Sequence, residues 1–298
     1  MKNSITVFTL LITLAATAQP KNSAEPYGGS ISGEDLKRHL YIIASPEMEG
    51  RGTGSKGIEK AAAYIENHFS SLGLTPGTKS GYQYYYPLYQ DSIELTGIRI
   101  NEMDFVQGRH FTVSARQSVN QSVSSQEIVF LGYGIDDPAY SDYKQINVKG
   151  KVVLVVEGEP RKNDTAFIIT GTSKRSNWGL NTLLKVKAAE KNGAVAVLVL
   201  PASFPKYNPD RKNTRTTLYP DYGTANEKYS INQYVVSDTL VSALLDTAIL
   251  SVVKTKMKTG QPLMPQTIKK PVVVNYSEAR FKTLTSNVVA VLPGTDLK

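Results

Sequence analysis

Two stretches near the amino end of the chain have the spacing of amphipathic helices. In the first, Leu36, Leu40 and Ile43 recur at helical intervals. Ser32 precedes them and has the side chain of a helix N-cap. Pro46 follows them and is expected to end the helix, because the residue before a proline disfavours helical backbone. The pattern predicts a first helix between these two residues.

The second stretch carries the clearest helical period in the sequence, and Gly73 follows it. Its apolar members form one stripe, namely Ile58, Ala62, Ile65, Phe69 and Leu72. Full burial of the four large members would contribute at most about 6–12 kcal/mol. We therefore expect a helix packed against a sizeable apolar surface. The aromatic run 81–90 comes next and contains Pro87, so it predicts an edge strand.

The pattern changes after about Ser114. Residues 114–126 are rich in Ser, Gln and Asn and predict a linker or loop. Beyond them, strand–helix–strand spacing indicates a small α/β or β-sandwich-plus-helix domain. The run 194–201 is apolar throughout, as in strands buried on both faces. The expected elements are a strand at 127–135, a turn at Gly150 with a strand after it, a helix at 181–193 ended by Gly193, a strand at 194–201, a strand and then a helix within 233–245, and two strands within 269–298 joined through 277–286.

Residues 1–18 predict a cleavable signal peptide. A short apolar run after a single lysine leads to Ala16-Thr17-Ala18, which has the small-x-small form of a cleavage site. The alternative is a buried N-terminal strand. Residues 19–30 are polar and rich in Gly and Pro, which predicts a flexible lead. We expect a secreted or periplasmic protein, and no later stretch is apolar for long enough to predict a membrane span.

Composition narrows the chemistry further. The chain has 298 residues, a formal net charge of +8 and no cysteine. Disulfides, thiol catalysis and cysteine zinc ligands are therefore excluded. The basic residues are scattered along the chain and form no recognisable binding module, so we expect no nucleic-acid partner.

The segment 49–65 raises the question of nucleotide binding, because Gly52, Gly54 and Gly57 form a G-x-G-x-x-G pattern ahead of a helix. A dinucleotide site needs a strand before the pattern and an acidic residue about 20 positions later, and both are missing. A P-loop lysine is missing too. The pattern is better interpreted as a lead into a helix, with glycines at positive φ. We expect Glu49 and Arg51 in this loop to pair with each other or with another domain.

No catalytic constellation is recognisable. G-x-S-x-G is absent, and the two S-x-x-K matches, at Ser141 and Ser251, lack the motifs that normally accompany them. The three histidines, His39, His68 and His110, have no metal-ligand spacing, so each is expected to be structural. We assign no catalytic residue and no metal-binding residue from these patterns.

The glycine loop and its neighbours nevertheless resemble a known family. The segment 39–76 is similar to the opening of secreted zinc aminopeptidases related to aminopeptidase Y, glutamate carboxypeptidase and the transferrin receptor (peptidase family twenty-eight). That opening has an LAS-x-x-x-EGR-x-x-G stretch, then a helix, then GL-x-P. The matching residues are Ala44-Ser45, Glu49-Gly50-Arg51, Gly54, Gly73-Leu74 and Pro76.

The middle of the chain resembles the protease-associated (PA) domain that many members of this family insert. Residues 130–160 and 187–200 match its patterns, and 285–298 match the strand on which the peptidase domain resumes. The resemblance implies an α/β fold, with an incomplete N-terminal lobe of the zinc-peptidase domain and an inserted PA domain that is β-rich with flanking helices. The implied division is 1–18 signal peptide, 19–30 lead, 31–112 peptidase segment, 113–270 PA insertion and 271–298 return to the peptidase domain.

The chain departs from the family at its end, because Lys298 comes before the family's first zinc-binding His-x-Asp. The resemblance implies zinc for the complete enzyme, no zinc bound by this chain, and peptide substrates. Glu49, Gly50 and Arg51 are the only candidate site residues, as a loop lining a cleft. We expect the N-terminal fragment of a secreted metal-dependent aminopeptidase, rather than a truncated gene product. The alternative function is a non-catalytic secreted PA-domain interaction module. The oligomeric state stays open.

Overall fold

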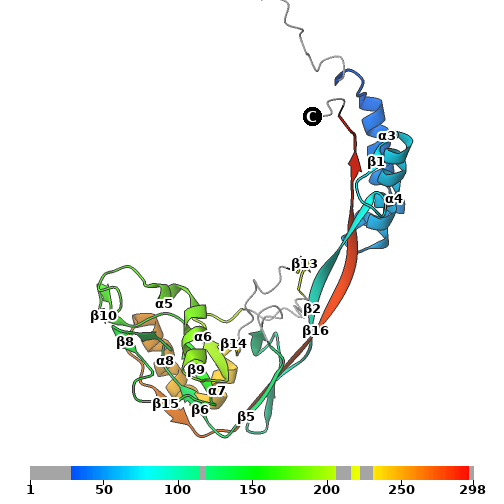
Figure 1. Ribbon diagram of the computed structural model, residues 1–298. Coiled ribbons are helices and arrows are strands. Elements are labelled where there is room, and N and C mark those ends of the chain that lie inside the picture. The colour runs from blue at the N-terminus through cyan, green and yellow to red at the C-terminus, as the bar shows by residue number, and fades with distance from the viewer. Residues whose placement is uncertain (1–27, 114–118, 206–215, 222–230, 295–298) are drawn as a thin grey trace, which may run out of the picture. The chain divides into compact units, whose positions relative to one another are not determined.

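The computed structural model describes residues 28–113, 119–205, 216–221 and 231–294. The chain divides into two compact units. Unit 1 joins the residues up to Tyr86 with those from Leu284 onward, and unit 2 is Pro87–Thr283. The chain passes from unit 1 to unit 2 along β2 (Gln83–Ile100) and returns along β16 (Val272–Val288) (Figure 1). The predicted signal peptide lies outside the described residues, as does most of the predicted lead.

Unit 1 begins with the two predicted helices. The first, α3 (Gly33–Ile43), has Ser32 as its N-cap, whose Oγ accepts a hydrogen bond from the Asp35 amide at 3.0 Å. The second, α4 (Lys56–Ser71), is capped by Ser55 in the same way. A 3-10 turn, η1 (Pro46–Arg51), connects them. Both helix predictions are confirmed, because capping and apolar spacing are local signals.

The expected apolar cover of α4 is wrong for the described part of the chain. Only Gly57, Ala61 and Ala62 of this helix are buried, and Leu72 is 60% exposed. The other large residues of the apolar stripe, Ile58, Ile65 and Phe69, are half-buried. No residue of α3 is buried. The strands of unit 1, which are β1 (Thr75–Pro76), β17 (Ala290–Val291) and the unit 1 ends of β2 and β16, offer the helices little surface.

Unit 2 is built on a six-stranded sheet in the order β15-β6-β9-β12-β14-β4. Its four central strands run parallel, and the strands at the two edges are antiparallel to their neighbours. The strands are β4 (Phe111–Val113), β6 (Ile128–Phe130), β9 (Val152–Val156), β12 (Ala196–Leu200), β14 (Asn232–Val236) and β15 (Gln266–Ile268). The helices are α5 (Asn177–Leu180), α6 (Thr182–Lys191), α7 (Asp238–Leu245) and α8 (Thr247–Thr259). The predicted α/β class is confirmed.

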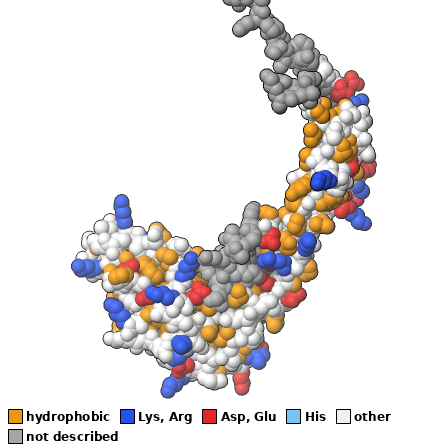
Figure 2. Space-filling model, in the orientation of Figure 1, with side chains coloured by type: hydrophobic (Ala, Val, Ile, Leu, Met, Phe, Trp, Pro, Cys, Tyr) orange, Lys and Arg blue, Asp and Glu red, His pale blue; other side chains and the backbone are white. Residues whose placement is uncertain are grey.

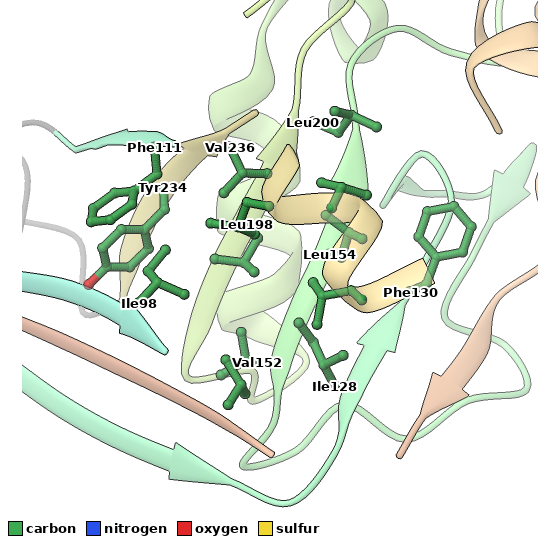
Figure 3. Close-up of a cluster of buried hydrophobic side chains, with 14 of the residues drawn as sticks. Ile98, Phe111, Ile128, Phe130, Val152, Leu154, Leu198, Leu200, Tyr234 and Val236 are labelled. Atoms are coloured by element: carbon green, nitrogen blue, oxygen red, sulfur yellow. The ribbon is translucent and has the colours of Figure 1, made fainter. Parts of the chain in front are cut away.

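The core of unit 2 lies on both faces of this sheet. On one face, side chains such as Ile128, Leu154 and Leu198 pack with the apolar residues of α7 and α8 (Figure 3). On the other face, Val153 and Val197 pack against Val186 of α6. Every residue of β9 and β12 is buried, as the continuous apolar runs predict. The turn at Gly150, the helix that ends before Gly193 and the strand–helix pair around Ser237 also match the predictions.

A second sheet has the order β13-β2-β16-β5, with β3 (Met103–Phe105) paired to β2 beside this path. It corrects three predictions. Residues 114–126 are not all loop, because β5 (Gln121–Ser125) pairs with β16. The predicted break at 277–286 is absent, since β16 is one strand. The prediction of an edge strand is wrong for β2, which lies between β16 and β13 (Tyr219–Pro220). Strand β13 pairs with Leu88 and Tyr89 of β2 and does not reach Pro87.

Two short hairpins complete unit 2, formed by β7 (Asp136–Asp137) with β8 (Tyr140–Ser141) and by β10 (Arg161–Asn163) with β11 (Ala166–Phe167). The expected PA segment, 113–270, falls inside unit 2, and its identity stays a prediction. Within the described ranges, no helix combines the length and the apolar character that crossing a membrane requires.

Candidate functional site

The candidate loop of unit 1 has an unusual backbone. Glu49, Gly50 and Arg51 have φ values of 50°, 74° and 54°, so three consecutive residues lie in the left-handed region. Two of them carry a Cβ, for which this conformation is uncommon. The run forms the last three residues of η1 and turns the chain ahead of α4, and such strain persists only where the surroundings enforce it.

The glycine pattern serves close packing at this turn. Gly57 sits in the first turn of α4, and a Cβ added there would lie 2.0 Å from the Met48 carbonyl oxygen. Gly54 has a φ of 77°, as expected for a helix lead, whereas Gly52 has an ordinary φ of −58°. The expected positive φ is therefore right for Gly54 and wrong for Gly52 and for Gly57, which is a helical residue of α4.

The acidic member of the loop is held by α4. Lys60 Nζ lies 2.5 Å from Glu49 Oε1 and also donates to the Glu47 carbonyl at 3.0 Å. The expected pair between Glu49 and Arg51 is wrong, because Lys60 projects from α4 over the loop. The Arg51 residue is exposed, and in the described part of the chain its side chain has no hydrogen bond or ion pair. That Glu49, Gly50 and Arg51 line a cleft stays a prediction.

Two histidines that are far apart in the sequence meet between the helices of unit 1. The Nδ1 atom of His39 lies 2.6 Å from the Tyr64 hydroxyl, and the ring centroids of His39 and His68 are 4.5 Å apart. Sequence reasoning missed this pair. No sequence spacing indicates it, because the two residues lie on different helices, and the pair forms only when α3 and α4 come together.

The third histidine stabilises a turn of unit 2. His110 Nδ1 accepts a hydrogen bond from the Val106 amide at 3.0 Å, and its ring packs edge-on against Phe105. Burial lowers the pKa of His110, and the Arg109 charge lowers it further. The S-x-x-K matches form no serine–lysine hydrogen bond in the described residues, where Ser141 bonds Asp136 and Lys254 pairs with Asp238.

Zinc ligands are not assembled in the described residues. Across residues 28–113, 119–205, 216–221 and 231–294, no group of three or more His, Cys, Asp or Glu side chains could hold a metal ion. The residues that the structure places therefore do not fit a zinc centre of the kind the family resemblance implies, and no catalytic step through zinc follows from them.

Unit 2 holds a buried polar cluster at the carboxyl ends of β6 and β9, where open α/β sheets commonly bind ligands. Lys185 is 1% exposed, and its Nζ donates to the carbonyls of Val156 at 2.7 Å and Gly158 at 2.5 Å. The carboxylate of Glu159 accepts hydrogen bonds from the Ser176 amide at 2.7 Å and from its hydroxyl at 2.5 Å. Sequence reasoning did not single out either charge.

A buried carboxyl belongs to the same cluster. Asp142 is 4% exposed and accepts from the Tyr140 hydroxyl at 2.7 Å and the Ile135 amide at 3.0 Å. Burial raises the pKa of Asp142 to about 6, against the lowering effect of these hydrogen bonds, and burial lowers the pKa of Lys185 to about 8. Because these groups are enclosed and hydrogen-bonded to the chain, they anchor loops to the sheet.

A second buried carboxylate joins distant parts of unit 2. Asp91, which is 1% exposed, accepts a hydrogen bond from the Tyr219 hydroxyl and another from Arg280 Nε at 3.0 Å. The Arg280 guanidinium also lies over the rings of Tyr89 and Tyr219. These contacts tie β2, β13 and β16 together and have a structural role.

Comparison with known proteins gives limited information. No family model matches the chain, and no curated protein matches it. An aminopeptidase from Aneurinibacillus sp. strain AM-1 is similar at 17% identity and a TM-score of 0.41, over 89% of this chain and 49% of that chain. BSAP, a zinc aminopeptidase from Bacillus subtilis, is similar at 14% identity and a TM-score of 0.37, over 88% and 48%.

A further solved structure belongs to the psychrophilic subtilisin-like protease Apa1 from Pseudoalteromonas sp. AS-11, at 12% identity and a TM-score of 0.28, over 65% of this chain and 35% of that chain. The chain thus spans about half the length of the two aminopeptidases. Since every TM-score lies below 0.5, these likenesses carry no argument about the activity of this chain.

Proposed function

We propose that this chain is the N-terminal part of a secreted, metal-dependent aminopeptidase-like protein that removes N-terminal residues from peptides. The sequence string from Ala44 to Pro76 supports the proposal, because it resembles the opening of that enzyme family over several separate motifs. Unit 1 is consistent with it, since these motifs form the turn and the helix ends that position α4.

The observation that carries the proposal is the apolar surface of unit 1. Large apolar side chains on its helices and strands are each more than half exposed, and Figure 2 shows hydrophobic side chains across this surface. They are Leu36, Leu40, Tyr41, Leu72, Tyr84, Tyr85, Leu284 and Leu292. Tyr84 and Tyr85 are consecutive in β2 and so point to opposite faces, which leaves both faces of the ribbon open. An exposed apolar surface of this kind is typical of a unit that packs against further protein.

Zinc belongs to the proposal for the complete protein. A zinc ion in the complete protein would supply Lewis-acid chemistry for peptide hydrolysis. The described residues of this chain contribute no ligand set for it. The proposed role of this chain is therefore to supply packing surface, with the Glu49–Arg51 loop lining the cleft.

A peptidase assay tests the proposal. We expect residues 19–298 to hydrolyse no aminoacyl-4-nitroanilide with or without added zinc, and a matched longer chain that continues into a His-x-Asp strand to hydrolyse it in a zinc-dependent way. Zinc-dependent hydrolysis by residues 19–298 alone would contradict the division of roles. Inactivity of the longer chain with zinc bound would contradict the proposed activity.

A second candidate function is a non-catalytic secreted interaction module. Unit 2 favours it, because this unit has a core on both faces of its sheet and internally satisfied buried charges. Under this alternative, the longer chain folds and is exported but has no hydrolytic activity with any divalent metal.

A further inference from the structure

The contact between α3 and α4 depends on one small cluster. None of the α3 residues is buried, and Leu36 and Leu40 of this helix are exposed. In the described residues, the hydrogen bond and the ring contacts that join the two helices all come from His39, to Tyr64 and to His68. Both imidazoles are half-buried. The apolar contribution to docking of α3 is therefore small, and the polar contribution is concentrated at two histidines.

The charged side chains on the surrounding elements do not compensate an imidazolium at this position. Asp35 pairs with Arg38, Lys60 of α4 pairs with Glu49 of η1, and the Glu66 carboxylate of α4 accepts a hydrogen bond from the Gln83 amide of β2. The other charged residues of α3, η1 and α4 are Glu34, Lys37, Glu47, Arg51, Lys56 and Glu59. No carboxylate forms a hydrogen bond or ion pair with His39 or His68 in the described part of the chain. The hydroxyl of Tyr64 is the one hydrogen-bond partner placed against the pair there.

We propose that this histidine pair makes the docking of α3 on α4 sensitive to acid. Histidine is the side chain that ordinarily gains a proton between pH 8 and pH 5. A protonated His39 Nδ1 donates to the Tyr64 hydroxyl oxygen, so the hydrogen bond between these two residues persists in acid. Two protonated rings with centroids 4.5 Å apart, however, repel each other. Because little apolar burial opposes this repulsion, α3 separates from α4 as the pH falls. The inference concerns unit 1 alone and does not depend on the proposed peptidase function.

Hydrogen exchange measured by mass spectrometry tests the inference. We expect the protection factors of residues 33–43 to fall about tenfold or more between pH 7.5 and pH 5.0. Protection factors are used because they are corrected for the intrinsic effect of pH on exchange. The variant H68Q removes one of the two imidazoles and should show no such fall. The variant H110Q removes a histidine outside the cluster and should behave like the wild type over residues 33–43. An unchanged protection of the wild type, or a full fall in H68Q, would overturn the inference.

Salt provides a second test that needs no variant. Repulsion between partly exposed charges is screened by salt. In the wild type, 0.5 M sodium chloride should therefore restore much of the protection of residues 33–43 at pH 5.0. The salt measurement also covers the case in which α3 of H68Q fails to dock at either pH. A fall in the protection of wild-type residues 33–43 that salt does not change is not electrostatic, and it would contradict the proposed mechanism.

Discussion

Gly57 approaches the Met48 carbonyl so closely that no side chain fits between them, since an added Cβ would lie 2.0 Å from that oxygen. The glycine pattern of residues 52–57 is thus explained by packing of η1 against the first turn of α4. Phosphate binding is not needed to account for it.

The variant G57A should therefore destabilise unit 1. Forcing a methyl group against the backbone of Met48 should cost about 1–3 kcal/mol in the free energy of unfolding. The matched control is G52A, because Gly52 has a φ of −58° and its added Cβ would meet nothing closer than Ser55 Oγ at 3.9 Å. Hydrogen exchange of residues 46–71 in the two variants measures the difference, and equal protection would refute the packing explanation.

Asp142 should make the stability of unit 2 depend on pH. Its folded pKa of about 6 lies above the ordinary value, so the folded state favours the protonated carboxyl. The stabilisation is complete below about pH 4 and is lost as the pH rises through about 6, amounting to roughly 2–3 kcal/mol. Urea unfolding followed by Trp178 fluorescence at pH 4, 5, 6 and 7 should show this trend in the wild type.

The variant D142N serves as the control for that titration. An amide cannot ionise, so the stability of D142N relative to the wild type should rise between pH 4 and pH 7. Parallel pH profiles for the two proteins would show that another group is responsible.

Ser176 should contribute to stability through the buried Glu159. The variant S176A removes the hydroxyl that donates to Glu159 at 2.5 Å and that also caps α5. Loss of a hydrogen bond to a buried carboxylate should cost about 1–3 kcal/mol. The exposed Ser173 supplies the control S173A, for which we expect a change within about 0.5 kcal/mol. Urea midpoints that coincide for both variants would argue against this role.

Arg280 and Asp91 should behave as a coupled pair. The variant R280Q leaves the enclosed Asp91 carboxylate with fewer hydrogen-bond partners. We expect the free energy of unfolding to fall by about 2 kcal/mol. This value is smaller than for a fully buried pair, because the Arg280 side chain is 44% exposed. Adding D91N removes the unpaired charge and should recover part of the loss. A double-mutant cycle by urea unfolding measures the coupling, and strictly additive losses would exclude it.

Local signals made part of this fold predictable from the sequence. Ser32 and Ser55 cap their helices through hydrogen bonds to amides three residues later in the chain. The continuous apolar run of β12 correctly predicted that this strand is buried. The polar strand β5 was missed because its stability comes from distant partners, such as the Gln121 amide bonded to the Val195 carbonyl. The only apolar residues of 116–126, Val119 and Val123, are four positions apart, so the sequence lacks the strict alternation that indicates a strand.

The side-chain sites were harder to predict, because each depends on elements brought together by the fold. Lys185 looked like a solvated residue of an ordinary helix, yet it points at the carboxyl end of β9 and is enclosed. Glu49 was predicted to pair with Arg51 or with another domain, and its partner is Lys60 on the next helix. His39 and His68 carry no spacing that indicates a pair until α3 and α4 are placed against each other.

The register of Thr75 with Val291 also fixes the order in which the molecule can be assembled during synthesis. A nascent chain exposes α3 and α4 long before the ribosome has made β17, and all of unit 2 emerges in the interval. The β1–β17 pair of unit 1 therefore forms only after this segment has been made, whereas all residues of unit 2 are available earlier. A premature stop before Leu284 would therefore release unit 2 attached to α3 and α4 without the strand that pairs with β1.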